Sequence, residues 1–237
     1  MKGGALVTGG AKRIGRAIAF GLAEIGYDIA LHYNHSLKEA QSAASEIEKK
    51  GVQCALFQCD LNRIDEVLQL MPKIFERFPE CNLLINNASI FERAGFLDTD
   101  PELLDRFLNI NFKAPFFLSQ DFARYCQEGQ IIHILDTKIS KEIVNYFTYG
   151  LTKKTLYEFM RMAAKALAPN IRVNGICPGM ILPSKDLSES DFEKLSQKIP
   201  VQHRGDPQNV VSAVRFLIEN SFVTGECLYV DGGEHLN

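Results

Sequence analysis

The sequence lacks the cysteine patterns of a metal site or of a disulfide framework. None of its six cysteines belongs to a C-x-x-C pair or another paired spacing, so neither zinc nor disulfides are indicated. Blocks of like charge are also absent and the formal net charge is −3, which argues against a nucleic-acid or membrane-surface role. No apolar run approaches the length of a membrane span, and the first strand-like segment begins too close to Met1 for a signal peptide. We therefore expect a cytoplasmic protein without a metal.

The chain has the composition of a globular protein with one core. Hydrophobic residues make up 46% of the sequence and charged residues 23%, which is ordinary for a soluble domain. A length of 237 residues fits one large α/β domain. No repeat, linker or low-complexity stretch divides the sequence, so residues 1–237 are predicted to form a single domain.

A tyrosine and a lysine four residues apart are the first candidates for chemistry. If residues from 148 onward are helical, Tyr149 and Lys153 share one face, and an apolar run ends at Asp136, thirteen residues before the tyrosine. A nearby ammonium stabilises a phenolate and can lower the phenol pKa from about 10 by roughly 1–3 units, which gives a proton donor near neutral pH. The pair alone is weak evidence, since Tyr149 can equally be a core tyrosine and Lys153 an exposed lysine.

A glycine-containing turn follows the first predicted strand. Residues 4–8 are mostly apolar, residues 8–15 read Thr-Gly-Gly-Ala-Lys-Arg-Ile-Gly, and apolar residues then recur at helical spacing. In this setting, backbone N–H groups and the helix N-terminus bind a pyrophosphate. Lys12 and Arg13 add positive charge where a phosphate would lie. The glycines do not follow the G-x-G-x-x-G spacing, so a plain strand–helix turn stays open as an alternative.

The second predicted strand, residues 28–33, ends without a carboxylate. NAD sites usually place an acidic residue at this point to hold the ribose 2′-hydroxyl. Here the strand end offers neutral or weakly basic side chains, namely His32, Asn34, His35 and Ser36. The first carboxylate is Glu39. Together with Arg13, this composition suits a 2′-phosphate, so we expect NADPH in preference to NADH.

Strand-like and helix-like patterns alternate along the rest of the chain. Further strands are expected at residues 53–58, 82–87, 131–135, 171–176 and 226–230, the fourth of these broken by residues 177–179. The strand at 53–58 leads into Asp60 and Leu61, in position to meet an adenine. The alternation predicts an α/β fold, a doubly wound parallel sheet of about seven strands.

The helices between these strands carry start and stop signals. Ser36 and Glu39 match a capping box for a helix that closes at Gly51, and Pro101 stands at the first position of a long phenylalanine-rich helix. Helices are also expected in the segment that ends at residue 78 and over residues 148–168 and 207–220. Residues 183–206 are polar and irregular, which suggests a lid over a substrate.

Taken together, these segments resemble the short-chain dehydrogenase/reductase family over essentially the whole chain. The matching pieces are, in order, Thr8-Gly…Gly15, Asp60, Asn86-Asn-Ala-Ser89, Asn111, Tyr149-x-x-x-Lys153 and Pro178-Gly179. The resemblance implies a Rossmann-type fold and an oxidoreductase. It also suggests a homotetramer, built on the phenylalanine-rich helix and the 148–168 helix.

Several departures from the family pattern resemble the pteridine reductase branch, including bacterial dihydromonapterin reductases. Arg13 and Ser89 replace usual glycines, Asp136 replaces the usual catalytic serine, and Pro183 stands near the position of a missing threonine. The C-terminal residues 222–225 and 231–236 also look like the dihydromonapterin enzymes. This branch implies a small-molecule pterin substrate, of the dihydromonapterin or dihydrofolate type, and hydride transfer from NADPH.

The resemblance also implies roles for individual residues. Phe91 matches the aromatic residue that stacks on the pterin, and Asn111 would steady a water in a proton relay to Lys153. His35 stands where pteridine reductases have an arginine, so the 2′-phosphate is assigned to Arg13 and Ser36. The full set expected to bind the cofactor is Gly9, Lys12, Arg13, Ile14, Tyr33, Asn34, His35, Ser36, Asp60, Leu61, Asn87, Ala88, Ser89, Tyr149, Lys153, Pro178, Gly179 and Ile181.

Asp136 separates the possible substrates. A ketone reductase needs a hydroxyl donor aimed at the carbonyl oxygen, whereas an ionised aspartate only accepts hydrogen bonds and would repel a developing oxyanion. Ring nitrogens of a pterin must be protonated, which a carboxylate serves directly or through water. Two alternatives stay open: a carbonyl reductase of the same family, such as a 3-oxoacyl-thioester reductase, and a dinucleotide-sensing protein without turnover.

Overall fold

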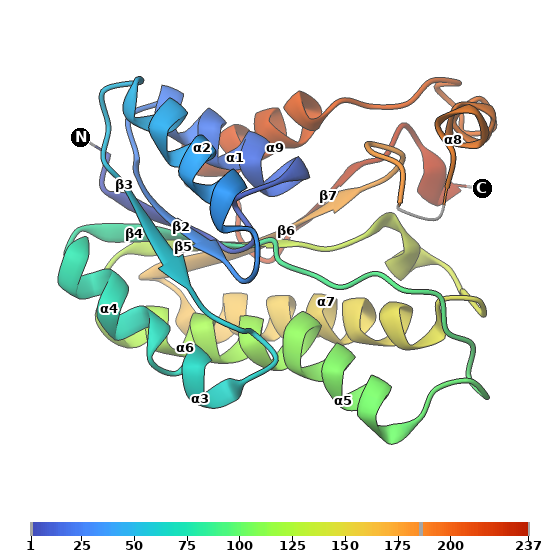
Figure 1. Cartoon of the computed structure of the whole chain (residues 1–237), viewed down its shortest axis with the longest axis horizontal. Helices are drawn as coiled ribbons and strands as arrows, with labels where there is room; N and C mark the ends of the chain where they lie inside the picture. The colour runs from blue at the N-terminus through green and yellow to red at the C-terminus, as the bar shows by residue number, and fades with distance from the viewer. Residues whose placement is uncertain (1, 185–186, 237) are drawn as a thin grey trace.

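The computed structural model of the chain describes residues 2–184 and 187–236 and contains a parallel sheet of seven strands (Figure 1). The strands are β1 (Gly4–Val7), β2 (Asp28–Tyr33), β3 (Cys54–Gln58), β4 (Cys81–Asn86), β5 (Gly129–Ile134), β6 (Ile171–Pro178) and β7 (Cys227–Val230). They lie in the order β3-β2-β1-β4-β5-β6-β7 and every neighbouring pair is parallel. The predicted fold class is confirmed.

The strand order reverses at the centre of the sheet. Strand β1 pairs with β2 on one side and with β4 on the other. The chain therefore adds β2 and β3 on one side of β1 and then crosses over to add β4 to β7 on the other side. In open α/β sheets, ligands bind beyond the carboxyl ends of the strands at such a point. The glycine turn follows β1 and the residues after Asn86 follow β4, so both predicted cofactor segments meet there.

Two layers of helices cover the sheet, one on each face (Figure 1). One layer holds α1 (Arg13–Glu24), α2 (Leu37–Glu48) and α9 (Pro207–Glu219). The other holds α3 (Ile64–Val67), α4 (Leu70–Arg77), α5 (Pro101–Leu108), α6 (Ala114–Tyr125) and α7 (Phe147–Leu167). A buried apolar cluster lies on each side, because strands covered on both faces bury both sets of side chains.

The long helix predicted from Pro101 onward is divided. Asp100 caps α5 by accepting a hydrogen bond from the backbone N–H of Leu103 at 2.8 Å, and Pro101 stands in the first turn as expected. A π-helical segment, Asn109–Lys113, then separates α5 from α6. Single π-helical turns inside α-helices often occur at functional sites. Here the segment carries the buried Asn111.

Four further expectations need correction. The capping box of α2 is wrong, because Ser36 makes no side-chain cap and Glu39 pairs instead with Lys12 at 2.6 Å. The segment that ends at residue 78 forms two short helices. Strand β6 continues to Pro178, because pairing with β7 extends to Val230. The segment 183–206, of which residues 185–186 lie outside the described part, contains the helix α8 (Glu189–Ser196).

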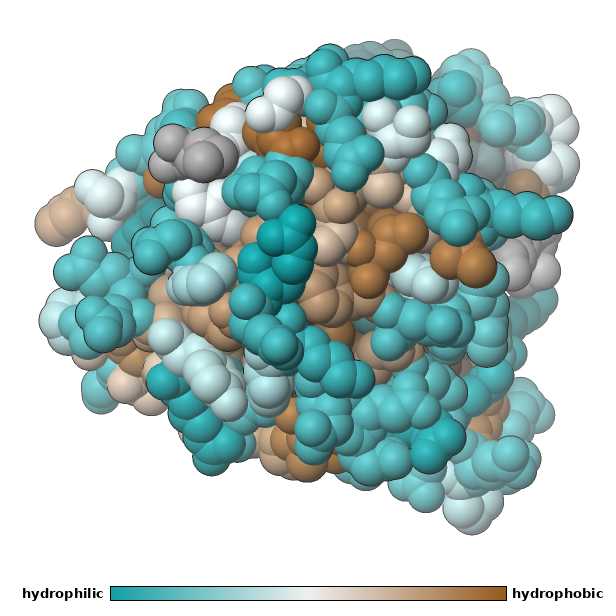
Figure 2. All heavy atoms as spheres, turned by 60° about the vertical axis from the view of Figure 1, so that its left-hand side comes forward, coloured by the Kyte–Doolittle hydropathy of each residue, from teal (hydrophilic) through white to brown (hydrophobic). Residues whose placement is uncertain are grey.

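The surface is mixed in character. The face shown in Figure 2 is mostly hydrophilic, with hydrophobic residues gathered near its centre. Within the described residues, none of the helices combines the length and the apolar character needed to cross a bilayer. The same residues contain no group of three His, Cys, Asp or Glu side chains arranged to hold a metal.

The close contact between α1 and α9 at Gly21 and Val211 can be tested by substitution. A Cβ added at Gly21 would lie 2.3 Å from Cγ1 of the buried Val211. Gly21→Ala should therefore lower the free energy of unfolding by about 1–3 kcal/mol, the usual cost of overpacking, despite the better helix propensity of alanine. Val211→Ala alone should also destabilise the protein by leaving a cavity.

The double variant provides the control, measured by urea unfolding of all four proteins. With alanine at both positions the two methyl groups share the available space, so the combined loss should be smaller than the sum of the single losses. Strictly additive losses would show that Gly21 and Val211 do not restrict each other.

Candidate active site

A short hydrogen bond joins the two residues at the centre of the predicted site. Asp136 follows β5, and Tyr149 lies in the first turn of α7. The phenol of Tyr149 donates to Oδ2 of Asp136 at 2.5 Å. The other carboxylate oxygen, Oδ1, accepts from the backbone N–H of Lys138 at 2.8 Å. Because both side chains are largely buried, the bond lies in a region of low polarity where it is stronger than in water.

Lys153 is buried on the same face of α7, one turn after Tyr149. Its ammonium donates to the backbone carbonyl of Ile134 at 2.8 Å and lies 5.8 Å from the centre of the Tyr149 ring. Burial lowers the pKa of Lys153 from 10.5 to about 8, although the Asp136 carboxylate opposes this shift. The predicted i, i+4 geometry is therefore confirmed, and the lysine is held at the end of β5.

The predicted direction of the Tyr149 pKa is wrong for this structure. Burial raises the pKa of the phenol well above its usual value of 10.0, and the Asp136 carboxylate raises it further by its charge and by the hydrogen bond. The carboxylate accepts a hydrogen bond directly from the phenol, whereas the Lys153 ammonium donates to a backbone carbonyl. Tyr149 is therefore a neutral phenol here, with its proton directed at Asp136.

Phe91 stands beside these groups as part of an aromatic cluster. Its ring stacks on Tyr146 with the centroids 4.5 Å apart and meets the Tyr149 ring edge-on at 4.7 Å. Phe91 is 36% exposed, so its ring also faces solvent. An exposed aromatic surface next to a buried proton donor is suited to a flat ligand.

The Asn111 side chain makes four hydrogen bonds within the protein. Its Oδ1 accepts from Ser89 Oγ at 3.1 Å and from the backbone N–H of Ile90 at 3.0 Å. Its Nδ2 donates to the Ile90 carbonyl at 3.1 Å and to Thr152 Oγ1 at 3.2 Å. These bonds use both ends of the amide, so the side chain fixes the segment before Phe91 to α7, and the expected role of Asn111 in a proton relay stays a prediction.

The turn after β1 has the shape of a dinucleotide-binding turn. Gly9 has a φ of +63°, and a Cβ on Gly15 would lie 2.3 Å from the Gly9 carbonyl oxygen, so only glycine fits at the start of α1. No acidic residue stands in the first turn of α1. Backbone N–H groups can thus approach a pyrophosphate, and these residues fit the expected NADPH.

The side chains of Thr8 and His32 fix this turn, which is a different role for His32 from the neutral-to-basic pocket predicted from the sequence. Thr8 Oγ1 accepts from the backbone N–H groups of Asn87 at 2.9 Å and Ala88 at 3.0 Å, which joins the turn to the end of β4. His32 is buried, and its Nδ1 accepts from the N–H of Gly9 at 3.0 Å while Nε2 contacts the Cys59 carbonyl at 3.0 Å. Burial lowers the pKa of His32 from 6.5 to about 4, so it is a neutral structural residue and not part of a basic site.

The predicted residues after β2 and β3 line one hollow. Asn34, His35 and Asp60 surround a cavity of about 370 Å³ together with Arg63, which the sequence analysis missed. Asn34 Nδ2 donates to Asp60 Oδ1 at 3.2 Å. Tyr33 and Leu61, also expected to bind the cofactor, are buried in the core clusters.

The two cations of the turn make other contacts in this structure. Arg13, with a φ of +53°, donates to the Pro183 carbonyl at 2.8 Å, and Lys12 pairs with Glu39 at 2.6 Å. Arg13 therefore contacts the start of the segment that was predicted to form a lid. Both cations remain near the start of α1.

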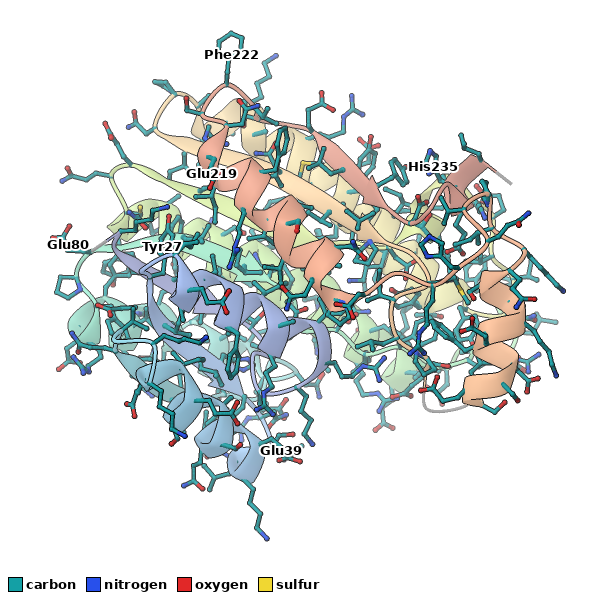
Figure 3. All side chains as sticks on the ribbon, turned by 90° about the horizontal axis from the view of Figure 1, so that it is seen from above. Tyr27, Glu39, Glu80, Glu219, Phe222 and His235 are labelled. Atoms are coloured by element: carbon teal, nitrogen blue, oxygen red, sulfur yellow. The ribbon has the colours of Figure 1, made fainter. Side chains whose placement is uncertain are left out.

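The third side of the site comes from the residues after β6 and β7. Gly179 N–H donates to the Val230 carbonyl at 3.1 Å, and Ile181 is buried nearby. Figure 3 shows His235, which follows β7, at the end of the molecule near α8, whereas Phe222, which precedes β7, projects from the opposite end. The C-terminal residues thus lie at the carboxyl ends of the strands, on the same side as the site.

Sequence reasoning also overlooked residues next to the predicted set. Tyr146 and Lys138 are near Phe91, Asp136 and Tyr149, but neither belongs to a recognised motif. Helical spacing gave no signal for Tyr146, because it is the N-cap residue of α7 and lies outside the predicted helix 148–168. For Lys138 no pattern in the sequence indicates its direction.

Comparisons with known proteins place this site in context. The family model described as Enoyl-(Acyl carrier protein) reductase matches residues 9–235. The chain is similar to a 3-oxoacyl-[acyl-carrier-protein] reductase of Staphylococcus epidermidis, with 28% identity and full coverage of both chains. An L-rhamnose 1-dehydrogenase (NAD(P)(+)) of a Sphingomonas species is 30% identical, with 98% of this chain and 96% of that protein covered. Among solved structures, FolM alternative dihydrofolate reductase 1 from Brucella suis in complex with NADP has a TM-score of 0.95 and 37% identity, with 99% and 95% coverage.

The lowered pKa of Lys153 predicts the pH dependence of turnover. Burial disfavours the ammonium, so Lys153 loses its proton as the pH rises through about 8. The phenol of Tyr149 keeps its proton over that range because its own pKa is raised. If the positive charge is needed, kcat/KM measured by NADPH oxidation should fall above pH ~8, because kcat/KM reports ionisations of the free enzyme.

A Lys153→Arg variant serves as the control. A guanidinium stays charged throughout this range, so the residual activity of the variant should show no alkaline decline near pH ~8. A profile for the unmutated protein that is flat from pH ~7 to ~10 would contradict the role given to the lysine charge.

Proposed function

The chain belongs to the short-chain dehydrogenase/reductase family, and on that premise we propose that it is an NADPH-dependent reductase of a dihydropterin. Membership in this family makes the protein an oxidoreductase. Structures similar to this chain were solved with NADP, which supports the same cofactor here. The substrate would be of the dihydromonapterin or dihydrofolate type.

The observation that carries the substrate proposal is the hydrogen bond from Tyr149 to Asp136. A carboxylate occupies the position from which a ketone reductase must donate to a carbonyl oxygen. Its Oδ2 accepts a hydrogen bond from the Tyr149 hydroxyl, with the two oxygens 2.5 Å apart. Such a pair is poorly suited to an oxyanion, because the charge of the carboxylate would repel it. It is well suited to a ring nitrogen that takes up a proton.

Residues from three parts of the chain would hold the cofactor. The glycine turn at residues 9–15 would bind the pyrophosphate, and the hollow lined by Asn34, His35 and Asp60 would bind the adenosine end. When bound, NADPH supplies the hydride. Gly179 and Ile181, beyond β6, would form the wall beside the nicotinamide.

Proton delivery follows from the buried pair. The phenolic proton of Tyr149 already points at Asp136 Oδ2, so the two oxygens hold one transferable proton between them. Passing that proton to a substrate nitrogen leaves a phenolate beside the carboxylate, so the pair carries a second negative charge until solvent returns a proton. The ammonium of Lys153, 5.8 Å from the tyrosine ring, would stabilise this charge in a site from which water is largely excluded.

Phe91 would position the flat substrate. Asn111 holds the backbone of Ile90 by two hydrogen bonds, which places Phe91 between Tyr146 and Tyr149. Stacking on a fixed aromatic ring contributes on the order of 1–3 kcal/mol per heterocyclic base and tolerates different ring substituents. The proposed role of Asn111 is thus positional, through the segment before Phe91.

A second candidate is a 3-oxoacyl-thioester reductase. The names of several relatives at 28–29% identity favour it, since they are 3-oxoacyl-[acyl-carrier-protein] reductases that cover this chain almost completely. Against it stands Asp136, which offers no donor to the keto oxygen while ionised. The similarity in structure to an alternative dihydrofolate reductase, at higher identity, favours the pterin.

We also propose a homotetramer, in which α6 and α7 form an interface. The helices carry aromatic side chains in mutual contact: the ring centroid of Phe116 lies 5.3 Å from that of Phe117 and 5.0 Å from that of Phe159. Met162 on α7 is 71% exposed and Tyr125 on α6 is 49% exposed. Large apolar side chains exposed on adjacent helices are typical of surfaces that associate.

Asp136→Ser tests the substrate class. Serine restores a small donor and removes the carboxylate, so dihydropterin reduction should fall on the order of a hundredfold, the low end for a proton-transfer group. Reduction of a simple ketone or an acetoacetyl thioester should rise relative to pterin reduction. The measurement is kcat/KM for both substrate classes in both proteins at fixed NADPH, with NADPH binding followed by its fluorescence.

Two outcomes would reject the pterin assignment. One is that the unmutated enzyme already prefers the thioester; the other is that serine leaves pterin turnover unchanged. Unchanged NADPH fluorescence in the variant would show that the cofactor site is intact, so that a loss of turnover reports on the proton transfer alone.

Arg13→Ala tests the cofactor preference, with Arg63→Ala as a companion. Losing a cation–phosphate contact costs roughly 1.5–3 kcal/mol, so removal of Arg13 should raise KM for NADPH about ten- to a hundredfold and leave KM for NADH nearly unchanged. Arg63 lines the hollow but pairs with Asp65 at 3.1 Å and Glu66 at 3.2 Å, so its removal should have the smaller effect. A larger rise of KM for NADPH in Arg63→Ala than in Arg13→Ala would assign the 2′-phosphate contact to Arg63. Equal efficiency of both cofactors in the unmutated protein would show that neither arginine makes such a contact.

A further inference from the structure

The turn after Asp136 is fixed to the C-terminal residues. It forms a short 3₁₀ helix, Thr137–Ser140, and a second one, Glu234–Leu236, lies against it. Thr137 Oγ1 donates to Asp231 Oδ2 at 2.6 Å, and Lys141 Nζ donates to the Glu234 carbonyl at 2.6 Å. The C-terminal residues therefore form a wall of the site next to the Asp136 carboxylate.

Lys138 lies in this wall, between the carboxylate and the aromatic ring. Its ammonium is 3.7 Å from Asp136 Oδ1 and 5.9 Å from the centre of the Phe91 ring, and its side chain is 30% exposed. At 3.7 Å the ammonium is within ion-pair range but outside hydrogen-bond range of the carboxylate. Attraction to the carboxylate and to the ring holds the charge in place, while its N–H groups can still donate to a ligand.

Glu234 supplies another carboxyl group to the same wall. Its Oε2 is buried, has no hydrogen-bond partner among the described residues, and lies 2.8 Å from the place a Cβ on Gly179 would take. Burial raises the pKa of Glu234, while the charges of Lys138 and Lys141 lower it. Three carboxyl groups, those of Asp136, Asp231 and Glu234, thus lie near the ammonium groups of Lys138 and Lys141, so the wall has no excess of positive charge.

We propose that Lys138 is a substrate-binding residue that donates a hydrogen bond to an acceptor atom, the ring oxo oxygen, of a flat heterocycle bound against Phe91. This inference rests on the proposed pterin function and deepens it. A wall without an excess of positive charge fits an uncharged ring better than a phosphate or a carboxylate, which would need an excess of cations. An ammonium only donates hydrogen bonds, so it binds an oxo oxygen and disfavours an amino group at the same ring position.

The test compares two ligands that differ at that one ring position. Binding of a 4-oxo pteridine and of its 4-amino analogue to the enzyme–NADPH complex is measured by competitive inhibition of turnover. In the unmutated protein the oxo ligand should bind more tightly. Lys138→Met removes the charge but keeps an unbranched side chain, so the ratio of the two affinities should shift toward the amino ligand by about ten- to a hundredfold, the range for a hydrogen bond to a charged group.

Two further variants make the result specific. Lys154→Met removes a lysine of similar exposure, 32%, that pairs with Glu142 and should leave the ratio unchanged. Lys138→Arg keeps a cationic donor and should restore most of the preference for the oxo ligand. The KM for NADPH should stay the same in all three variants.

The outcomes separate the two proposals. If the unmutated protein binds both pteridines and Lys138→Met leaves the ratio unchanged, Lys138 does not contact the oxo group and the pterin function stands. If the unmutated protein binds neither pteridine, the proposed function falls and the role of Lys138 falls with it. A ratio that shifts equally in Lys154→Met would also overturn the assignment, because the effect would then be one of general charge.

Discussion

The site depends on one buried hydrogen bond, from the phenol of Tyr149 to the carboxylate of Asp136. A carboxylate in a water-poor region is costly unless hydrogen bonds and charges compensate for its lost hydration. The phenol at 2.5 Å, the backbone N–H of Lys138 at 2.8 Å and the nearby Lys138 ammonium provide that compensation. The surrounding architecture keeps these groups together, because Asp136 stands two residues beyond the end of β5 and α7 returns along the sheet with Tyr149 in its first turn.

Much of the fold was predictable because parallel strands buried on both faces read as short apolar runs. The bounds of β2 and the first turn of α5 follow from local patterns, and the seven-stranded sheet follows from their alternation. The errors lie where tertiary contacts override local signals. Glu39 forms an ion pair with Lys12 in place of the expected helix cap, and β6 extends through Pro178 because β7 pairs with it.

The candidate site was predictable in its members but not in their interactions. Tyr149, Lys153 and Asp136 do converge, but the direction of the Tyr149 pKa depends first on the burial of the phenol and then on its contact with the Asp136 carboxylate, and spacing along a helix gives neither. Asn111 fills both ends of its amide with bonds to Ser89, Ile90 and Thr152, which no pattern in the sequence shows. The roles of Lys138 and Glu234 require knowing that the C-terminal turn lies against the turn after Asp136.

Strand β2 separates two tasks along its length. His32 points to the glycine turn, where as a neutral ring it accepts from the Gly9 N–H, while Asn34 and His35, just beyond the strand, line the hollow that also contains Asp60. His32 therefore supports the turn that would bind the pyrophosphate, whereas the contact to a 2′-phosphate is proposed for Arg13, within that turn, and for Ser36, beyond the strand. We expect substitutions at residues 34–36 to change cofactor preference and to leave the turn intact, whereas a substitution at His32 would impair the use of either dinucleotide.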